Sequence, residues 1–173
     1  MPNKHRRTSI LEAAPSVERS NGLLRELVSH LRESREALRP LWVEQMTSKG
    51  LLAGLTPEET ESESMNIYDT CVGCLDSGQY DGAETYATSM AGRGVLRGMT
   101  TEQIIGIFAT LRDVYGRSLF ARYQSDMDRL TSALDVYEPV ANKILSIVAL
   151  PIIGVIDSQR ACQLGAARAN GIR

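Results

Sequence analysis

Apolar residues recur every three or four positions along most of the chain, and charged residues fill the positions between them. This spacing predicts amphipathic helices that each bury one stripe of side chains. We expect Pro40 to kink or divide the first helix, because proline lacks an amide and crowds the preceding turn. Gly50 is its expected stop. This helix begins at Leu23, and its stripe consists of Leu24, Leu27, Val28, Leu31, Leu38, Leu41, Trp42 and Met46.

The segment "LTPEETESES" predicts the start of a second helix. Thr56 can cap that helix, Pro57 suits its first position, and Glu59 completes a capping box. The other glutamates complement the positive end of the helix dipole. We expect the helix to end at Gly78.

The middle of the chain predicts two more helices. A shorter helix is expected near residues 81–91, and the three glycines of "GRGVLRG" predict a loop after it. Thr100 or Thr101 caps the next helix, and Gln103 stands in capping-box position for Thr100. The buried stripe of that helix consists of Ile104, Phe108, Leu111, Tyr115 and Leu119.

Residues 126–138 predict a helix with a narrow apolar stripe formed by Leu130, Leu134 and Tyr137. Two interpretations remain open. The stripe could pair with a single partner helix, or the segment could be the last helix of the bundle. Pro139 disfavours helical geometry in Glu138, so we expect the helix to end there.

After Pro139 the chain becomes rich in β-branched residues, which favour strands. We expect two short strands within residues 140–156, then a helix capped by Asp157 or Ser158. Pro151 and Gly154 argue against one long helix. The apolar run contains polar residues and is shorter than the about 20 residues of a spanning helix, so we expect no membrane span.

Composition narrows the class of protein. The chain has 173 residues and a net charge of −2, which gives no electrostatic reason to expect nucleic acid. The chain has three cysteines, an odd number too small for a dense disulfide framework. This count suits a reducing compartment, so we expect a cytoplasmic protein. Residues 1–20 are polar and lack periodicity, and they predict a disordered tail.

Residues that carry chemistry are sparse. The only histidines are His5 and His30, and neither lies in the middle of the chain. A Ser/His/Asp catalytic triad therefore lacks a suitable histidine, and we expect no enzyme activity. Cys71 and Cys74 form a single CxxC, which lacks the further ligands that zinc needs and indicates small packing residues. Three arginines could bind an anion together with the amides at the helix start near Thr100. They are Arg93, Arg97 and Arg112. The favoured interpretation is that they lie in a loop exposed to solvent.

The run "PVANKILSIVALPIIGVIDSQRA", residues 139–161, resembles the opening of the STAS domain in RsbR-type stressosome proteins. The shared features are a proline-led first strand, a second strand that ends L-P-x-x-G, and the stretch x-x-D-[ST]-x-R-A. "LRPLWVEQM" and "MTTEQIIGIFATLRDVY" are similar to the sensory domain of the same family. Together the resemblance covers residues 22–161.

The resemblance implies a mainly α fold. A globin-like helical bundle would occupy residues 21–125, a linker helix residues 126–138, and a truncated STAS start, with two short strands and a helix, residues 139–173. Members of the family dimerise, and Leu130, Leu134 and Tyr137 are the expected seam. An uninterrupted helix through residues 140–156, packed in the bundle, would contradict the STAS assignment and the role that goes with it.

The resemblance also implies a function. RsbR-type proteins are stress sensors and scaffolds without enzyme activity. They assemble with a STAS-only stressosome protein and sequester a serine/threonine switch kinase, whose release activates a sigma factor or another output. Ser158 occupies the Ser/Thr position of the shared motif and is the phosphorylation candidate. No cofactor is expected.

An alternative on the same fold is a haem-binding or small-ligand sensor. Globins usually hold haem through a histidine, and the middle of this chain has none, so His30, a cysteine or a tyrosine would have to replace it. His30 is more simply interpreted as a surface or half-buried helix residue.

Overall fold

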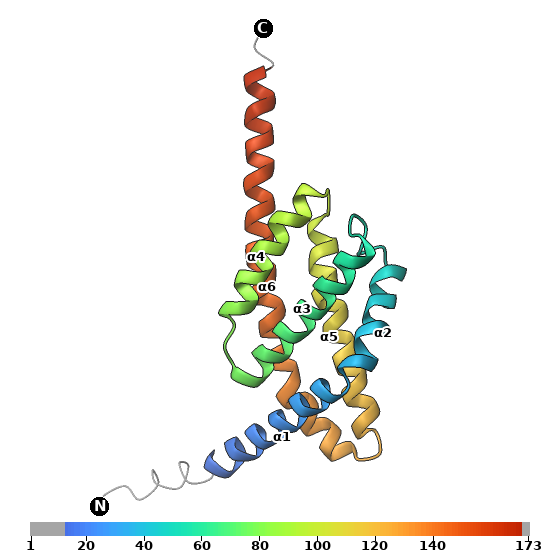
Figure 1. Cartoon of the computed structure of the whole chain (residues 1–173). Helices are drawn as coiled ribbons and strands as arrows, with labels where there is room; N and C mark the ends of the chain where they lie inside the picture. The colour runs from blue at the N-terminus through green and yellow to red at the C-terminus, as the bar shows by residue number, and fades with distance from the viewer. Residues whose placement is uncertain (1–12, 171–173) are drawn as a thin grey trace, which may run out of the picture.

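The computed structural model describes residues 13–170 of the chain. Between these residues it contains helices and turns and no strand, so the expected all-α bundle is confirmed (Figure 1). In chain order the helices are α1 (Ala13–Glu33), α2 (Arg35–Ser48), α3 (Pro57–Ser77), α4 (Asp81–Leu96), α5 (Thr101–Tyr123) and α6 (Met127–Asn170).

The predicted helix starts are confirmed at α3 and α5. The Thr56 hydroxyl accepts a hydrogen bond from the amide of Glu59 at 3.2 Å, and the Glu59 carboxylate accepts one from the amide of Thr56 at 2.9 Å. Thr100 and Gln103 form the same reciprocal pair. The left-handed backbone at Gly78 (φ 67°) caps α3, a conformation that costs glycine least.

Three predicted boundaries of the first half are wrong. Helix α1 begins at Ala13, so residues 13–20 are helical and only residues 1–12 of the expected tail lie outside the described residues. The break between α1 and α2 falls at Ser34, where the carbonyl accepts hydrogen bonds from two following amides, and Pro40 lies inside α2. Helix α4 runs to Leu96, which makes most of the expected glycine loop helical.

All six helices contribute side chains to one core, in which the polar atoms of Trp42 and Tyr68 are hydrogen-bonded. The indole Nε1 of Trp42 donates to the carbonyl of Ile107 at 3.1 Å, and the Tyr68 hydroxyl donates to the carbonyl of Leu31 at 2.6 Å. The Tyr115 ring meets the Tyr68 ring edge-on, with centroids 5.1 Å apart. These bonds fix three helices around α3 while the aromatic bodies supply apolar burial.

Helix α3 is acidic, and arginines from three neighbouring helices pair with it. This arrangement corrects the idea that Arg93 and Arg97 converge on an anion, because each already binds a carboxylate of α3. The pairs are exposed or half-buried, so each contributes little to stability. They are Arg32–Asp76, Arg35–Asp69, Arg39–Glu61, Arg93–Glu63 and Arg97–Glu59.

The largest difference concerns residues 139–170, which form one helix with residues 127–138. The expected strands within residues 140–156 and the expected helix end at Glu138 are therefore wrong in this structure. Buried residues recur at helical spacing through the segment, and this periodicity outweighs β-propensity. They are Ala141, Ile144, Val148 and Ile152. Pro139 lies on the exposed side of α6, where water can satisfy the carbonyl that its missing amide leaves unpaired.

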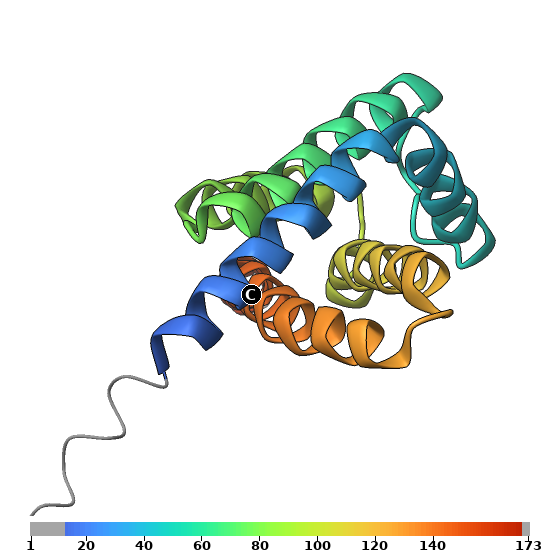
Figure 2. The same ribbon diagram turned by 90° about the horizontal axis from the view of Figure 1, so that it is seen from below.

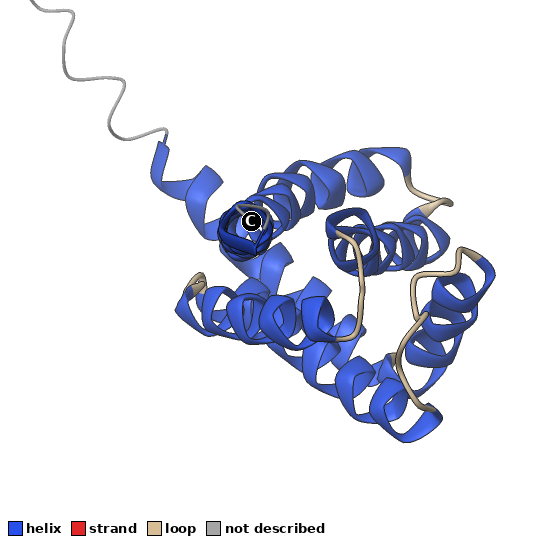
Figure 3. Ribbon diagram, turned by 90° about the horizontal axis from the view of Figure 1, so that it is seen from above, coloured by secondary structure: helices blue, strands red, loops and turns tan. Residues whose placement is uncertain are grey.

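Helix α6 runs along α4 and α5 and then leaves the bundle. Figure 2 shows its first part running along one side of the bundle, and Figure 1 shows its last part rising beyond the other helices. Seen from above, this last part stands at the edge of the bundle (Figure 3). The stretch Met127–Val155 has the length and hydropathy of a membrane span, but Val148 and Ile152 within it belong to the protein core.

Candidate functional site

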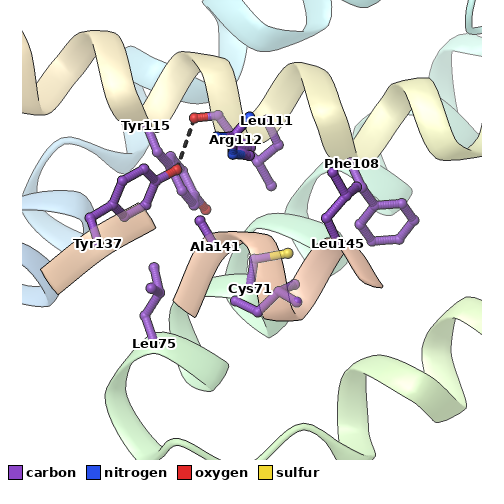
Figure 4. Close-up of a pocket in the computed structure, with 10 residues that line it drawn as sticks. Cys71, Leu75, Phe108, Leu111, Arg112, Tyr115, Tyr137, Ala141 and Leu145 are labelled. Carbon is purple, nitrogen blue, oxygen red and sulfur yellow. Dashed lines mark hydrogen bonds between the residues drawn. The ribbon is translucent and has the colours of Figure 1, made fainter. Parts of the chain in front are cut away.

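The candidate site is the contact of α6 with α3 and α5, which leaves a small, partly open cavity (Figure 4). Its volume of about 20 Å³ suffices for about one water molecule. The lining is mostly apolar and comes from three helices. It consists of Cys71, Leu75, Phe108, Leu111, Arg112, Tyr115, Tyr137, Ala141, Ile144 and Leu145.

Tyr137 and Glu138 hold α6 against α5 through one residue, Arg112. The buried hydroxyl of Tyr137 donates to the Arg112 carbonyl at 2.8 Å, and the Arg112 guanidinium binds the Glu138 carboxylate. The hydrogen bond to Glu138 raises the pKa of Arg112, and burial raises the pKa of Tyr137. Backbone and side chain of Arg112 are thus both engaged by neighbouring residues of α6.

The three expected seam residues divide between core and surface. Leu130 is 3% and Tyr137 1% exposed, and both belong to the core of the monomer. Leu134 is half-buried and lines a surface hollow beside Phe120, which is 51% exposed. Side chains buried this deeply are unavailable to a second copy, so of the two interpretations of this stripe the structure favours the last helix of a bundle.

His30 is half-buried on α1 and faces α5, not the cavity. Its Nε2 lies 2.8 Å from the Ser118 hydroxyl, and its Nδ1 lies 3.3 Å from Nη1 of Arg122. A guanidinium can only donate, so Nδ1 accepts and the ring proton resides on Nε2. In that tautomer Nε2 donates a hydrogen bond to the Ser118 hydroxyl.

A network of charged and polar groups continues from His30 toward α6. Arg122 lies 3.7 Å from the Glu26 carboxylate, which also accepts from the Tyr123 hydroxyl at 2.7 Å and from Arg129 at 2.5 Å. The hydrogen bond from Tyr123 lowers the pKa of Glu26. Burial, followed by the charge of Arg122, lowers the pKa of His30. The network joins α1, α5 and the start of α6 at one end of the bundle.

The cavity does not fit haem. Cofactor sites usually enclose about 300–1,000 Å³, far more than this cavity, and the lining has no histidine. Cys71 is the cysteine in the lining, and burial raises its pKa, which keeps the sulfur a neutral thiol rather than a ligand. A small ligand would need the helices to separate.

The two cysteines of the CxxC are buried packing residues, as predicted. Cys71 is 5% and Cys74 4% exposed, and both are free thiols. Burial raises the pKa of each, so neither is a reactive thiolate.

Ser158 lies inside α6 rather than at a helix start, so the expected capping role is wrong. Its side chain is exposed, and its hydroxyl donates to the carbonyl of Gly154 at 2.8 Å. Asp157 beside it is also exposed. In this position a phosphate on Ser158 would gain nothing from the amides at a helix start.

Sequence reasoning missed the partners of His30. Ser118 is 88 residues from His30, and Tyr123 is 97 residues from Glu26. The only available signal was that Ser118 and Arg122 stand four residues apart and therefore share one face of a helix.

Comparison with protein-family models, with curated proteins and with solved structures finds no match to this chain. The function is therefore inferred from the site and from the sequence motifs.

Proposed function

We propose that this chain is a non-enzymatic sensory and interaction module of the RsbR type, in which α6 is the output element. One observation carries the proposal: α6 belongs both to the core and to the outside. Leu130 and Ile152 are buried in the bundle, whereas Asp157, Ala161 and Cys162 are exposed on the part that leaves it.

A rearrangement of the core would move this exposed part. Tyr137 and Glu138 attach α6 to Arg112 of α5, and the cavity beside Tyr137 leaves unfilled space at that contact. Packed helix contacts tend to switch between discrete arrangements. A signal that alters the α5–α6 contact would therefore displace the end of α6, where a partner can detect it.

The stressosome setting is supported by the resemblance of the upstream segments. We infer that the bundle is the globin-like sensory domain and that it acts as a homodimer in the cytoplasm. The STAS part of the resemblance loses its structural support, because residues 140–156 are helical and packed in the bundle. This helix is the result stated above to contradict the STAS assignment and the role that goes with it. The proposal therefore rests on the resemblance of the upstream segments alone, and its proposed partners are a STAS-only stressosome protein and a serine/threonine switch kinase.

Size-exclusion chromatography of the purified chain with a purified STAS-only protein and switch kinase from the same organism tests the proposal. We expect the STAS-only protein to co-elute with the chain. Ala161→Trp, which places a bulky ring on the exposed end of α6, should reduce co-elution. Ala121→Trp, at an exposed position of α5, is the matched control and should leave it intact. Separate elution of all three proteins would contradict the proposal.

A further inference from the structure

Helix α6 carries apolar side chains on the face opposite the core. Leu150 is 71% and Ile153 44% exposed, and Ile147 is half-buried. Only 22% of the most apolar stretch of this helix is buried in the bundle. An uncovered apolar surface of this kind marks a contact site.

Two pairs of residues on this side of α6 lie symmetrically about Leu150: Lys143 with Asp157, and Ile147 with Ile153. Positions 143, 147, 150, 154 and 157 follow one another at three- and four-residue spacing, so they share one helix face. Lys143 stands seven residues before Leu150 and Asp157 seven residues after it, and both are exposed. A Cβ added at Gly154 would meet no atom within 4 Å, so the face is open there.

We propose that this face, hereafter the Leu150 face, binds the Leu150 face of a second copy in antiparallel orientation, with the two-fold axis at Leu150. Residue i of one helix then meets residue 300 − i of the other. Lys143 of each copy faces Asp157 of the other, and Ile147 meets Ile153. A contact of this kind uses the same patch on both subunits, as two-fold dimers do.

The charges select both the occupant and the orientation. In a parallel pair, Lys143 would face Lys143 and Asp157 would face Asp157, which is repulsive at both ends. In an antiparallel pair both contacts are attractive. The face is therefore complementary to itself when two copies are antiparallel. A different partner would need a negative charge opposite Lys143 and a positive charge opposite Asp157. The face extends about 21 Å at the helical rise of 1.5 Å per residue.

This inference shares the homodimer with the proposed function and names its contact surface, but it does not depend on the stressosome partners. It rests on the exposed face of α6, and it replaces Leu130 and Tyr137, which are buried, as the location of a dimer contact. A dimer without stressosome partners, or partners without this dimer, would separate the two proposals.

Sedimentation analysis over a range of concentrations tests the contact. We expect the full chain to form a dimer that Leu150→Glu converts to a monomer. Leu96→Glu is the matched control, because Leu96 is an 84% exposed leucine on α4, and it should leave the dimer unchanged. Both positions are exposed, so circular dichroism should show the same helix content in all three proteins.

A charge exchange tests the orientation. Lys143→Glu should raise the dimer dissociation constant about tenfold, because two attractive pairs become repulsive. Adding Asp157→Lys should restore it. Lys143 also lies 4.9 Å from the centre of the Tyr80 ring, but Asp157→Lys cannot repair that contact, so rescue reports the pairing between copies.

Three results would overturn the proposal. They are a wild-type chain that stays monomeric at its highest soluble concentration, a double variant that dimerises no better than Lys143→Glu alone, and a monomer that sediments with lipid vesicles through Leu150.

Discussion

At the scale of single residues, the network around His30, hereafter the His30 junction, has the best-defined hydrogen bonds. The donor-only guanidinium of Arg122 favours the tautomer in which Nδ1 accepts, and Ser118 then accepts a hydrogen bond from Nε2. The sequence allowed the prediction that His30 is a helix residue outside any catalytic set. It could not identify Ser118, because contacts between residues 88 positions apart depend on how the helices pack.

The His30 junction predicts acid sensitivity. The fold lowers the pKa of His30 from its ordinary value of 6.5, so near that pH the folded chain binds fewer protons than the unfolded chain. Neutral His30 therefore stabilises the folded chain above about pH 6.5, and this stabilisation is lost as the pH falls through the lowered pKa. Urea unfolding at several pH values should show this decline. His30→Gln should remove that part of it, and an identical decline in the variant would contradict the assignment.

Tyr137→Phe tests the bond between α6 and α5. Loss of the hydroxyl removes one of the hydrogen bonds accepted by the Arg112 carbonyl inside α5, and we expect the free energy of unfolding to fall by about 0.5–1.5 kcal/mol. Tyr80→Phe is the control. It keeps the ring over which Lys143 lies, so its effect should be under about 0.5 kcal/mol. Equal effects in urea unfolding would contradict the specific role of Tyr137.

At the scale of elements, the starts of two helices could be predicted from the sequence, whereas the secondary structure of residues 140–156 could not. The capping boxes at Thr56 and Thr100 are local signals that require no knowledge of the fold. Residues 140–156 carry competing signals: β-branched composition favours strands and Pro151 argues against a helix, whereas the spacing of Ala141, Ile144, Val148 and Ile152 favours a helix. The neighbouring helices α4 and α5 provide an apolar surface for that spacing, and this tertiary contact decides the outcome.

Two glycines of α4 provide a matched test of helix packing. A Cβ at Gly94 would lie 2.9 Å from Cδ1 of Ile104, whereas a Cβ at Gly92 would meet nothing within 4 Å. Gly94→Ala should lower the free energy of unfolding by about 1–2 kcal/mol. Gly92→Ala should raise it by about 0.5–1 kcal/mol, because alanine is the better helix former. Shifts of the same sign in thermal unfolding would contradict the close approach of α4 and α5.

At the scale of the whole molecule, α6 combines a protected part with an unsupported part. A helix without tertiary contacts is marginal in water, so the two parts should differ in local stability. In the Leu150→Glu variant, hydrogen exchange followed by mass spectrometry should show slow exchange for amides of residues 130–152. Residues 157–170 should exchange much faster. Equal protection along α6 would contradict its role as a projecting output helix.

The chain also contains its own optical reporter. Trp42 is the single tryptophan, it is fully enclosed, and its indole is bonded to the Ile107 carbonyl of α5. Any rearrangement that separates α2 from α5 must break that hydrogen bond and expose the indole ring to water. The intrinsic emission of the unlabelled protein therefore follows the opening of the bundle directly, so candidate signals can be screened by titration without altering a residue.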